Sequence, residues 1–409
     1  MKRVVVTGAG AISALGNDWA TVAPRLRAGQ SAVVRMEDWS KYKGLNTQLA
    51  APVPEFETPA HYTRKRTRGM GRVALMAVLA SEAALRDAGL YGDPLVTSGE
   101  LGIAYGSSTG TPEAVADFGR MLLDCSTEGV SATTYIRMMP HTTAVNIGVF
   151  FGITGRILTT SSACTSGSQG IGYAYETIRA GRQVAMLAGG AEELDPTEAA
   201  VFDTLFATST RNDAPQTTPR PFDAARDGLV LGEGAGTLLL EELEHARARG
   251  ARILAEVVGF GTNSDGAHVT QPNADTMAQA MRLALRDGGI DPSSIGYVNA
   301  HGTATDHGDV AESHATHAVL GAGVPISSLK SYLGHTLGAC GALEAWLTIE
   351  MMRAGWFAPT LNLTTPDPRC APLDYIAGEG RVLEADHVMS NNFAFGGINT
   401  SLVFRRWAD

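Results

Sequence analysis

The chain has 409 residues, 44% of them hydrophobic and 18% charged, which is enough for one or two packed domains with a large core. Its formal net charge of −10, from 42 acidic and 32 basic residues, argues against nucleic acid or a membrane surface as the main partner. The four cysteines form no CxxC pair and no apolar run reaches the length of about 18 residues that spans a membrane. We therefore expect a reduced, cytoplasmic protein without a bound metal, whose N-terminus is a strand rather than a secretory signal.

Strands and helices alternate in the first half of the chain. Short apolar, β-branched runs predict buried strands at 3–8, 101–108, 156–163 and 184–190. Longer alanine-rich stretches predict helices at 71–90 and 167–182. This alternation is typical of α/β proteins, in which helices cover a sheet.

The segment TGAGAIS (7–13) begins like a dinucleotide-binding fingerprint. Ser13 stands at the third glycine position, and no acidic residue follows at the expected distance of about 20 residues. We therefore interpret these glycines as a turn that lets a helix pack closely, and not as a nucleotide site.

The pattern of the first half starts again near residue 250. Strand-and-loop patterns lie at 251–266 and 295–303, and a helical pattern lies between them at 276–290. No proline-rich or low-complexity linker separates the halves. The sequence predicts two similar halves, 1–250 and 251–409, that pack as one body.

A cysteine among small residues is the first candidate for chemistry. Cys164 lies in TTSSACTSGSQG (159–170), between a predicted strand and a predicted helix. A thiol at a helix N-terminus has its pKa lowered by the helix dipole, and small neighbours leave space for a ligand and for backbone N–H donors. An ordinary buried cysteine is the competing interpretation, and the local sequence leaves both open.

Two histidines and a lysine strengthen the catalytic interpretation. His301 directly follows the predicted strand at 295–300, and His335 follows Gly334 in SLKSYLGH. Lys330 precedes His335 among apolar and small residues, so we expect its charge to be paired if it is buried.

Five motifs in order resemble the elongating β-ketoacyl-acyl carrier protein synthases. SSACTSG, HGTATDHGD, SLKSYLGH and NNFAFGGIN are similar to the nucleophile, first-histidine, lysine–histidine and glycine-rich-loop motifs of that family. STRNDAPQTTPRPFDAARDGLVLGEGAG is similar to its central segment. The resemblance covers nearly the whole chain, and it implies an α/β, thiolase-like fold in which two similar halves form a layered αβαβα arrangement.

The resemblance also implies a reaction. An acyl chain would pass from the phosphopantetheine of an acyl carrier protein to Cys164, and malonyl-carrier protein would then lose CO₂ and attack the new thioester. The backbone N–H groups of Cys164 and Phe393 would hold the thioester oxyanion, and neutral His301 and His335 would hold the enolate oxygen.

The family pattern implies supporting roles for further residues, and no bound cofactor. Lys330 would orient His301, and Glu344 would organise the buried polar network. Thr303, Thr305 and Thr270 resemble the hydroxyl groups that bind pantetheine amides.

Three other functions are weighed against this one. A biosynthetic thiolase needs a second cysteine in the C-terminal glycine-rich loop, and NNFAFGGIN contains none, so Cys340 and Cys370 are interpreted as packing residues. A starter-type synthase would have asparagine in place of His335. A chain-length-factor-like partner subunit would lack the nucleophile, and Cys164 argues against it.

The chain departs from the family pattern at three positions. Ala304 replaces a usual glycine or serine, and Ala394 follows Phe393 where glycine is common, which predicts a stiffer loop. Thr109 stands where a larger apolar residue often shapes the floor of the acyl pocket. Fatty acyl, polyketide and aryl-polyene chains all remain open as substrates.

Partner surfaces are predicted as well. Basic residues that we expect to contact an acidic carrier protein are Arg64, Lys65, Arg66, Arg68, Arg211 and Arg220. The family builds a homodimer by pairing sheet edges near the nucleophile strand, which here would be GRILTTSSAC (155–164). The apolar segment 133–155 would contribute to that interface.

Overall fold

The computed structural model describes residues 1–54, 56 and 58–408. In this part of the chain, eleven strands form one mixed sheet in the order β13-β11-β10-β15-β16-β9-β1-β8-β6-β4-β5. Their bounds are β1 (Val4–Ser13), β4 (Leu101–Gly106), β5 (Ile157–Thr159), β6 (Ala185–Glu192), β8 (Gly234–Glu242), β9 (Ala255–Ser264), β10 (Ile295–Asn299), β11 (Pro325–Ser327), β13 (Asp374–Tyr375), β15 (His387–Phe393) and β16 (Ile398–Arg406). Two small sheets contain β2 (Val34–Arg35), β3 (Leu49–Ala51), β7 (Leu231–Gly232), β12 (Trp356–Phe357) and β14 (Arg381–Val382).

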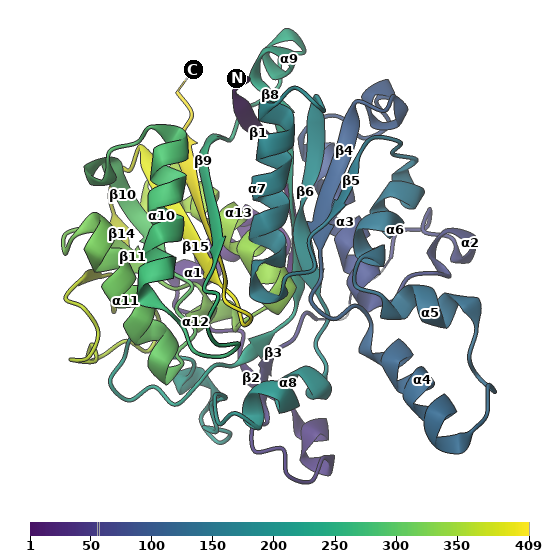
Figure 1. Cartoon of the computed structure of the whole chain (residues 1–409), viewed down its shortest axis with the longest axis horizontal. Coiled ribbons are helices and arrows are strands. Elements are labelled where there is room, and N and C mark those ends of the chain that lie inside the picture. Colours follow the sequence, from purple (N-terminus) through teal and green to yellow (C-terminus); the bar gives the residue numbers. More distant parts are fainter. Residues whose placement is uncertain (55, 57, 409) are drawn as a thin grey trace.

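The helices are arranged in layers on both faces of this sheet. They are α1 (Trp19–Arg27), α2 (Arg64–Thr67), α3 (Arg72–Asp87), α4 (Pro112–Asp124), α5 (Ala132–Met138), α6 (Thr142–Phe151), α7 (Ser166–Arg179), α8 (Pro196–Asp203), α9 (Leu243–Ala248), α10 (Ala274–Gly288), α11 (Asp306–Leu320), α12 (Lys330–Leu333) and α13 (Cys340–Ala354). Helices α7 and α13 pack against each other and against both halves of the sheet, while α3 covers β1 and β8 and α10 covers β9 and β16 (Figure 1). The predicted αβαβα arrangement is confirmed.

Close packing of helices on the central strands depends on glycine. A Cβ added at Gly8 in β1 would lie 2.4 Å from the carbonyl oxygen of Ala84 in α3. A Cβ added at Gly261 in β9 would lie 2.1 Å from the carbonyl oxygen of Ala280 in α10. The predicted packing role of the TGAGAIS glycines is therefore confirmed, but the predicted turn is wrong, because these residues continue β1 to Ser13.

The central helix α13 is buried on all sides. Its residues from Cys340 to Met352 are buried, because it lies between the two halves of the sheet. An apolar helix in this position holds the chain on either side of it in place. The turn that carries His335 directly precedes it, and this arrangement fixes that turn against the nucleophile segment.

The predicted strand at 156–163 is shorter in the structure and ends at Thr159. From Thr160 onward the chain contacts the start of α7 instead. The Thr160 hydroxyl donates to the Ser166 carbonyl at 2.8 Å, and the Ser162 N–H donates to the Ser166 hydroxyl at 2.9 Å. This strand, β5, is the last strand of the sheet, at the edge position predicted for it.

The apolar segment 133–155 is divided between core and surface. Phe150 is buried, whereas the side chains of Tyr135, Ile136 and Val149 are exposed. None of the described helices is long and apolar enough to cross a membrane. The predicted boundary near residue 250 falls between α9 and β9, and the division into 1–250 and 251–409 stays our proposal.

Candidate active site

Cys164 lies in a tight turn between β5 and α7. The turn is a single 3₁₀ segment, Ala163–Thr165, in which Ala163 has a positive φ of 51°. The thiol is 4% exposed, and His335 Nε2 lies 3.0 Å from Cys164 Sγ. The backbone N–H groups of Phe395 and of Cys164 itself are directed at the sulfur. The turn thus presents the sulfur to a nitrogen base and to two backbone donors.

The oxyanion role predicted for the Phe393 backbone N–H stays a prediction, and a second backbone N–H lies near the sulfur. Phe393 ends β15, where it pairs with Asn399, and its ring lies 6.1 Å from that of His301. The amide that reaches the sulfur belongs to Phe395, two residues later. The left-handed positions of the following turn are Gly396 and Gly397, with φ of 89° and 74°. Ala394 does not adopt a positive φ, so the predicted cost of alanine at this position is absent in this conformation.

The predicted lowering of the thiol pKa is wrong. Burial raises the pKa of the Cys164 thiol to about 11, and the ammonium group of Lys330 and the two backbone donors offset only part of this rise. Cys164 rests as a thiol, and its activation requires a proton acceptor at the moment of reaction.

The two histidines meet at right angles beside the sulfur. Their ring centroids lie 5.2 Å apart with an interplanar angle of 87°, and both side chains are buried. Burial, together with the charge of Lys330, holds the pKa of His301 and of His335 well below the usual range. Both rings are neutral at physiological pH, as the sequence analysis expected. Cys164 Sγ and a ring nitrogen of each histidine lie within 4.8 Å of one another, so all three reach one reacting group.

Lys330 is paired, as expected for a buried charge. Its Nζ donates to Glu344 Oε1 at 2.5 Å, and both side chains are almost fully buried. Glu344 Oε2 also accepts from Asn392 at 2.8 Å and from Asn299 at 3.5 Å. Burial alone would lower the pKa of Lys330, but the Glu344 carboxylate raises it, so the ammonium stays charged. Neither asparagine was predicted as a site residue, although Asn392 stands inside the motif NNFAFGGIN.

Glu312 is a further site residue, one that the sequence motifs did not predict. Its carboxyl oxygens accept from the backbone N–H groups of His301 and Gly302, both at 2.7 Å. Burial raises the pKa of this carboxyl group to about 8. Its spacing of eleven residues from His301 across a loop and a helix has no recognisable chemical pattern, so only the fold identifies it.

A cavity of about 600 Å³ connects Cys164 to the surface. Thr303, Thr305 and Thr270 line it, and the hydroxyl oxygens of Thr303 and Thr305 lie 2.9 Å apart. Their binding of pantetheine amides stays a prediction. Thr109 is not among the described lining residues. Its backbone N–H donates to Glu192 at 3.2 Å, which places it beside a buried carboxyl group instead of in this cavity.

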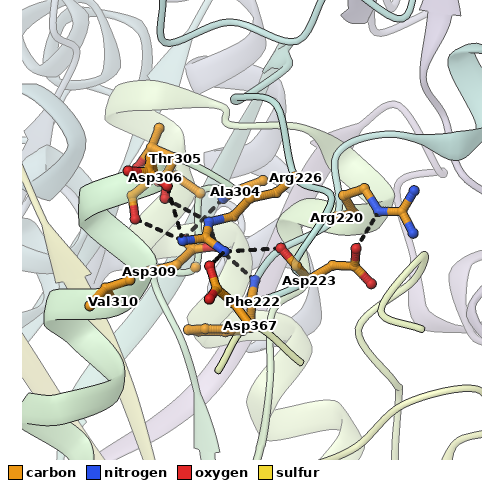
Figure 2. A network of polar contacts seen from close by, with 12 residues as sticks. Arg220, Phe222, Asp223, Arg226, Ala304, Thr305, Asp306, Asp309, Val310 and Asp367 are labelled. Carbon is orange, nitrogen blue, oxygen red and sulfur yellow. Dashed lines mark hydrogen bonds and ion pairs between the residues drawn. The ribbon is translucent and has the colours of Figure 1, made fainter. Parts of the chain in front are cut away.

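A buried arginine clamps the loop that bears the two threonines (Figure 2). Arg226 is 1% exposed and donates to the backbone carbonyls of Thr305 and Asp306, at 3.1 and 2.8 Å, and to Asp367 at 2.6 Å. Asp309 accepts from the backbone N–H of Ala304 at 3.1 Å.

This network explains how alanine is held at position 304. Ala304 has a positive φ of 65°, a conformation that disfavours a residue with a Cβ. Asp309 also accepts from the Phe222 N–H at 2.7 Å, so one carboxylate fixes Ala304 against a second chain segment. The network holds the backbone on which Thr303 and Thr305 face the cavity.

The predicted docking residues divide into exposed and paired groups. Arg64, Lys65 and Arg66 in the short helix α2 are exposed, as is Arg68 directly after it. Arg66 also stacks on Phe150, with its guanidinium carbon 3.7 Å from the ring centre. Arg211 pairs with Asp227 at 3.3 Å and Arg220 with Asp223 at 3.0 Å. None of the six belongs to the described lining of the cavity.

Comparison with known proteins agrees with this geometry. The chain is 40% identical over 413 residues to a 3-oxoacyl-[acyl-carrier-protein] synthase 2 of Vibrio cholerae, with 99% of each chain covered. The crystal structure of a β-ketoacyl synthase from Burkholderia phymatum is 64% identical, covers 100% of both chains and has a TM-score of 0.99.

A third similar structure is the ketosynthase complex AntDE:AntF, described as a type II polyketide acyl carrier protein with its ketosynthase bound to the hexaketide. It is 31% identical, covers 99% of this chain and 100% of the other, and has a TM-score of 0.89. The family models for the N-terminal and C-terminal domains of β-ketoacyl synthases match residues 1–246 and 254–364. The chain therefore belongs to the β-ketoacyl synthase family and has its thiolase-like fold.

Proposed function

We propose that this protein is an elongating 3-oxoacyl-acyl carrier protein synthase, an acyltransferase that catalyses decarboxylating condensation. The main evidence is that Cys164 Sγ lies 3.0 Å from His335 Nε2, next to His301, in a cavity open to the surface. A thioester held in that cavity meets a nucleophile, backbone oxyanion donors and two neutral imidazoles.

The first half-reaction transfers the acyl chain. Cys164 Sγ attacks the thioester carbonyl, the carbonyl oxygen becomes an oxyanion facing the N–H groups of Cys164 and Phe395, and the pantetheine sulfur leaves. The proton of the Cys164 thiol passes by way of His335 Nε2 to the departing sulfur. Because burial raises the pKa of this thiol to about 11, a proton acceptor at 3.0 Å is essential for the attack.

The second half-reaction forms the carbon–carbon bond. A malonyl group on the carrier protein loses CO₂, and the resulting enolate oxygen accepts hydrogen bonds from His301 and His335. The enolate carbon attacks the acyl-Cys164 carbonyl, and the Cys164 sulfur leaves as a thiolate that takes up one proton from water. Burial and the charge of Lys330 together hold the pKa of both histidines low, which keeps the rings neutral and competent as donors. Bonds and protons balance without a redox cofactor or a metal.

Two alternative functions are less well supported. Cys340 Sγ donates to the Cys164 carbonyl at 3.1 Å and does not belong to the described cavity lining, so it packs behind the nucleophile and is not placed to act as the second cysteine of a thiolase. A chain-length-factor-like subunit needs no thiol beside a histidine, and this chain has one.

The proposed function is tested by identifying the acyl group that becomes bound to Cys164. The purified protein is incubated with fatty acyl, polyketide and aryl-polyene thioesters of acyl carrier protein, and peptides containing Cys164 are weighed by mass spectrometry. An acyl adduct on Cys164, and β-ketoacyl product after addition of malonyl-carrier protein, support the proposal. Absence of adducts with all three classes contradicts it, and the class that loads best identifies the acyl chain.

We further propose that an acidic carrier protein contacts α2. Reversing the charge of an exposed residue, by Lys65→Glu or Arg68→Glu, is expected to raise the apparent KM for acyl carrier protein substrates about fivefold, because an attraction becomes a repulsion. A small pantetheine thioester carries no acidic protein, so its KM should stay unchanged. Lys2→Glu, with the same change in net charge, is the matched control. Equal effects on both substrates would contradict docking at α2.

We also propose a homodimer joined at β5. This strand ends the sheet and exposes Ile157, so pairing with a second β5 under two-fold symmetry would satisfy its free backbone edge. The exposed side chains of Tyr135 and Val149 would be covered in the same interface. Light scattering of the purified protein in dilute solution is expected to give about 86 kDa, twice the chain mass of 42.9 kDa. A stable monomer with full condensing activity would contradict this proposal.

A further inference from the structure

Phe206 combines exposure with an unfavourable backbone conformation. Its side chain is 89% exposed, and its φ is 54°, in the left-handed region that favours glycine. The residue lies in the turn that ends α8, where its N–H donates to the Asp203 carbonyl at 3.0 Å. Glycine is the usual residue in such turns. A large aromatic ring at this position adds no buried contact that would offset its conformational cost.

The position of Phe206 supplies a reason for this cost. Phe206 lines the outer part of the cavity that reaches Cys164, together with Leu205 and Val269, which are 47% and 68% exposed. Phe206 also borders a second hollow of about 500 Å³. The Val269 carbonyl accepts from the Gly396 N–H at 2.8 Å, so the backbone under this exposed side chain is held in place. These three residues form an apolar collar at the cavity mouth.

We propose that the collar of Leu205, Phe206 and Val269 is an anchoring surface for the acyl carrier protein. This inference rests on the proposed function, because a carrier protein must rest on the mouth while its phosphopantetheine arm reaches Cys164. Exposed aromatic residues beside hollows are typical anchors of protein interfaces, where they are desolvated on binding.

The collar complements the basic residues predicted to dock the carrier. Charged residues at the rim of an interface mainly steer association, whereas an aromatic anchor mainly slows dissociation. Asp227 and Asp306, which also line the cavity, pair with Arg211 and Arg226 respectively. Pairing of these carboxylates reduces the repulsion that an acidic carrier protein would meet at the mouth. An apolar contact suits this position, because it can hold an acidic partner without a further basic residue at the mouth.

The test is Phe206→Gly in the full chain. Glycine removes the ring and relieves the positive φ, so the midpoint of thermal unfolding is expected to rise by about a degree or two. The apparent KM for acyl- and malonyl-carrier protein is expected to rise about tenfold, the loss typical of an aromatic anchor. The KM for a small pantetheine thioester should change less than about twofold. Val382→Ala, which removes an exposed apolar side chain on β14, is the matched control and should change neither KM.

The outcomes separate this inference from the proposed function. An unchanged KM for carrier protein in active Phe206→Gly protein would overturn the inference and leave the proposed function standing. An equal rise in KM for both substrates would also overturn it, since Phe206 would then contact the arm and not the carrier. If the mass of Phe206→Gly by light scattering is half that of the unaltered protein, the collar contacts a second copy of this chain, and the inference is overturned too. Failure of the unaltered protein to use either substrate would overturn both proposals.

Discussion

Cys164→Ala is expected to abolish condensation and leave the fold intact. Loss of a nucleophile in covalent catalysis costs on the order of 10⁶-fold in turnover. The substitution removes one sulfur from a turn whose neighbouring side chains are small, and the hydrogen bond from the Ser162 N–H to the Ser166 hydroxyl that shapes the turn does not involve the thiol. Product formation from acyl- and malonyl-carrier protein measures the loss, and thermal unfolding measures the fold.

The control for this variant is Cys125→Ala. Cys125 is an exposed cysteine at the end of α4, so its replacement should remove surface alkylation by iodoacetamide without removing condensation. Labelling of the unaltered protein should be slow at Cys164 because burial raises the pKa of that thiol to about 11. Near-normal chain elongation by Cys164→Ala would end its assignment as the nucleophile.

His301→Ala is expected to lower malonyl decarboxylation and condensation by about 10²- to 10³-fold, the typical effect of one oxyanion donor. Acyl transfer to Cys164 should survive much better, because the ring nitrogen within hydrogen-bond distance of the Cys164 sulfur belongs to His335 and not to His301. His335→Ala should lower decarboxylation to a similar extent and also slow acyl transfer. Release of CO₂ and the mass of the Cys164 peptide measure the two steps separately.

Glutamine at the same positions is the rescue variant. A side-chain amide keeps one N–H donor but does not accept and release a proton as imidazole does. His301→Gln should therefore recover part of the decarboxylation lost in His301→Ala. Loss of acyl transfer together with decarboxylation in both His301 variants would show that the enolate-donor role is wrong.

The role of neutral His301 and His335 as enolate donors also predicts how decarboxylation depends on pH. Burial and Lys330 hold the pKa of both histidines well below the usual range, so the neutral donors persist as the pH falls through the value at which an exposed histidine becomes charged. The neutral-histidine requirement alone therefore predicts no loss of decarboxylation between about pH 8 and pH 6.5.

The arrangement of motifs along the chain was sufficient to predict the layered α/β fold and the residues that meet at the site. Strand and helix periodicity are local properties, and they identified α3, α7 and α10 within a few residues. A cysteine among small residues and a lysine among apolar ones are local anomalies as well. Family resemblance then indicated which residues share one site.

Only the tertiary structure decided how these groups act on one another. The thiol pKa rises because atoms from the whole fold exclude water from Cys164, a sum that no local pattern contains. The backbone N–H near the Cys164 sulfur is that of Phe395, because Phe393 is still paired with Asn399 in the sheet and the chain turns after it. Thr109 faces Glu192, and Arg226 clamps the threonine loop, through contacts between segments more than 75 residues apart. Such contacts depend on how helices and strands pack, and local sequence does not specify that distance or direction.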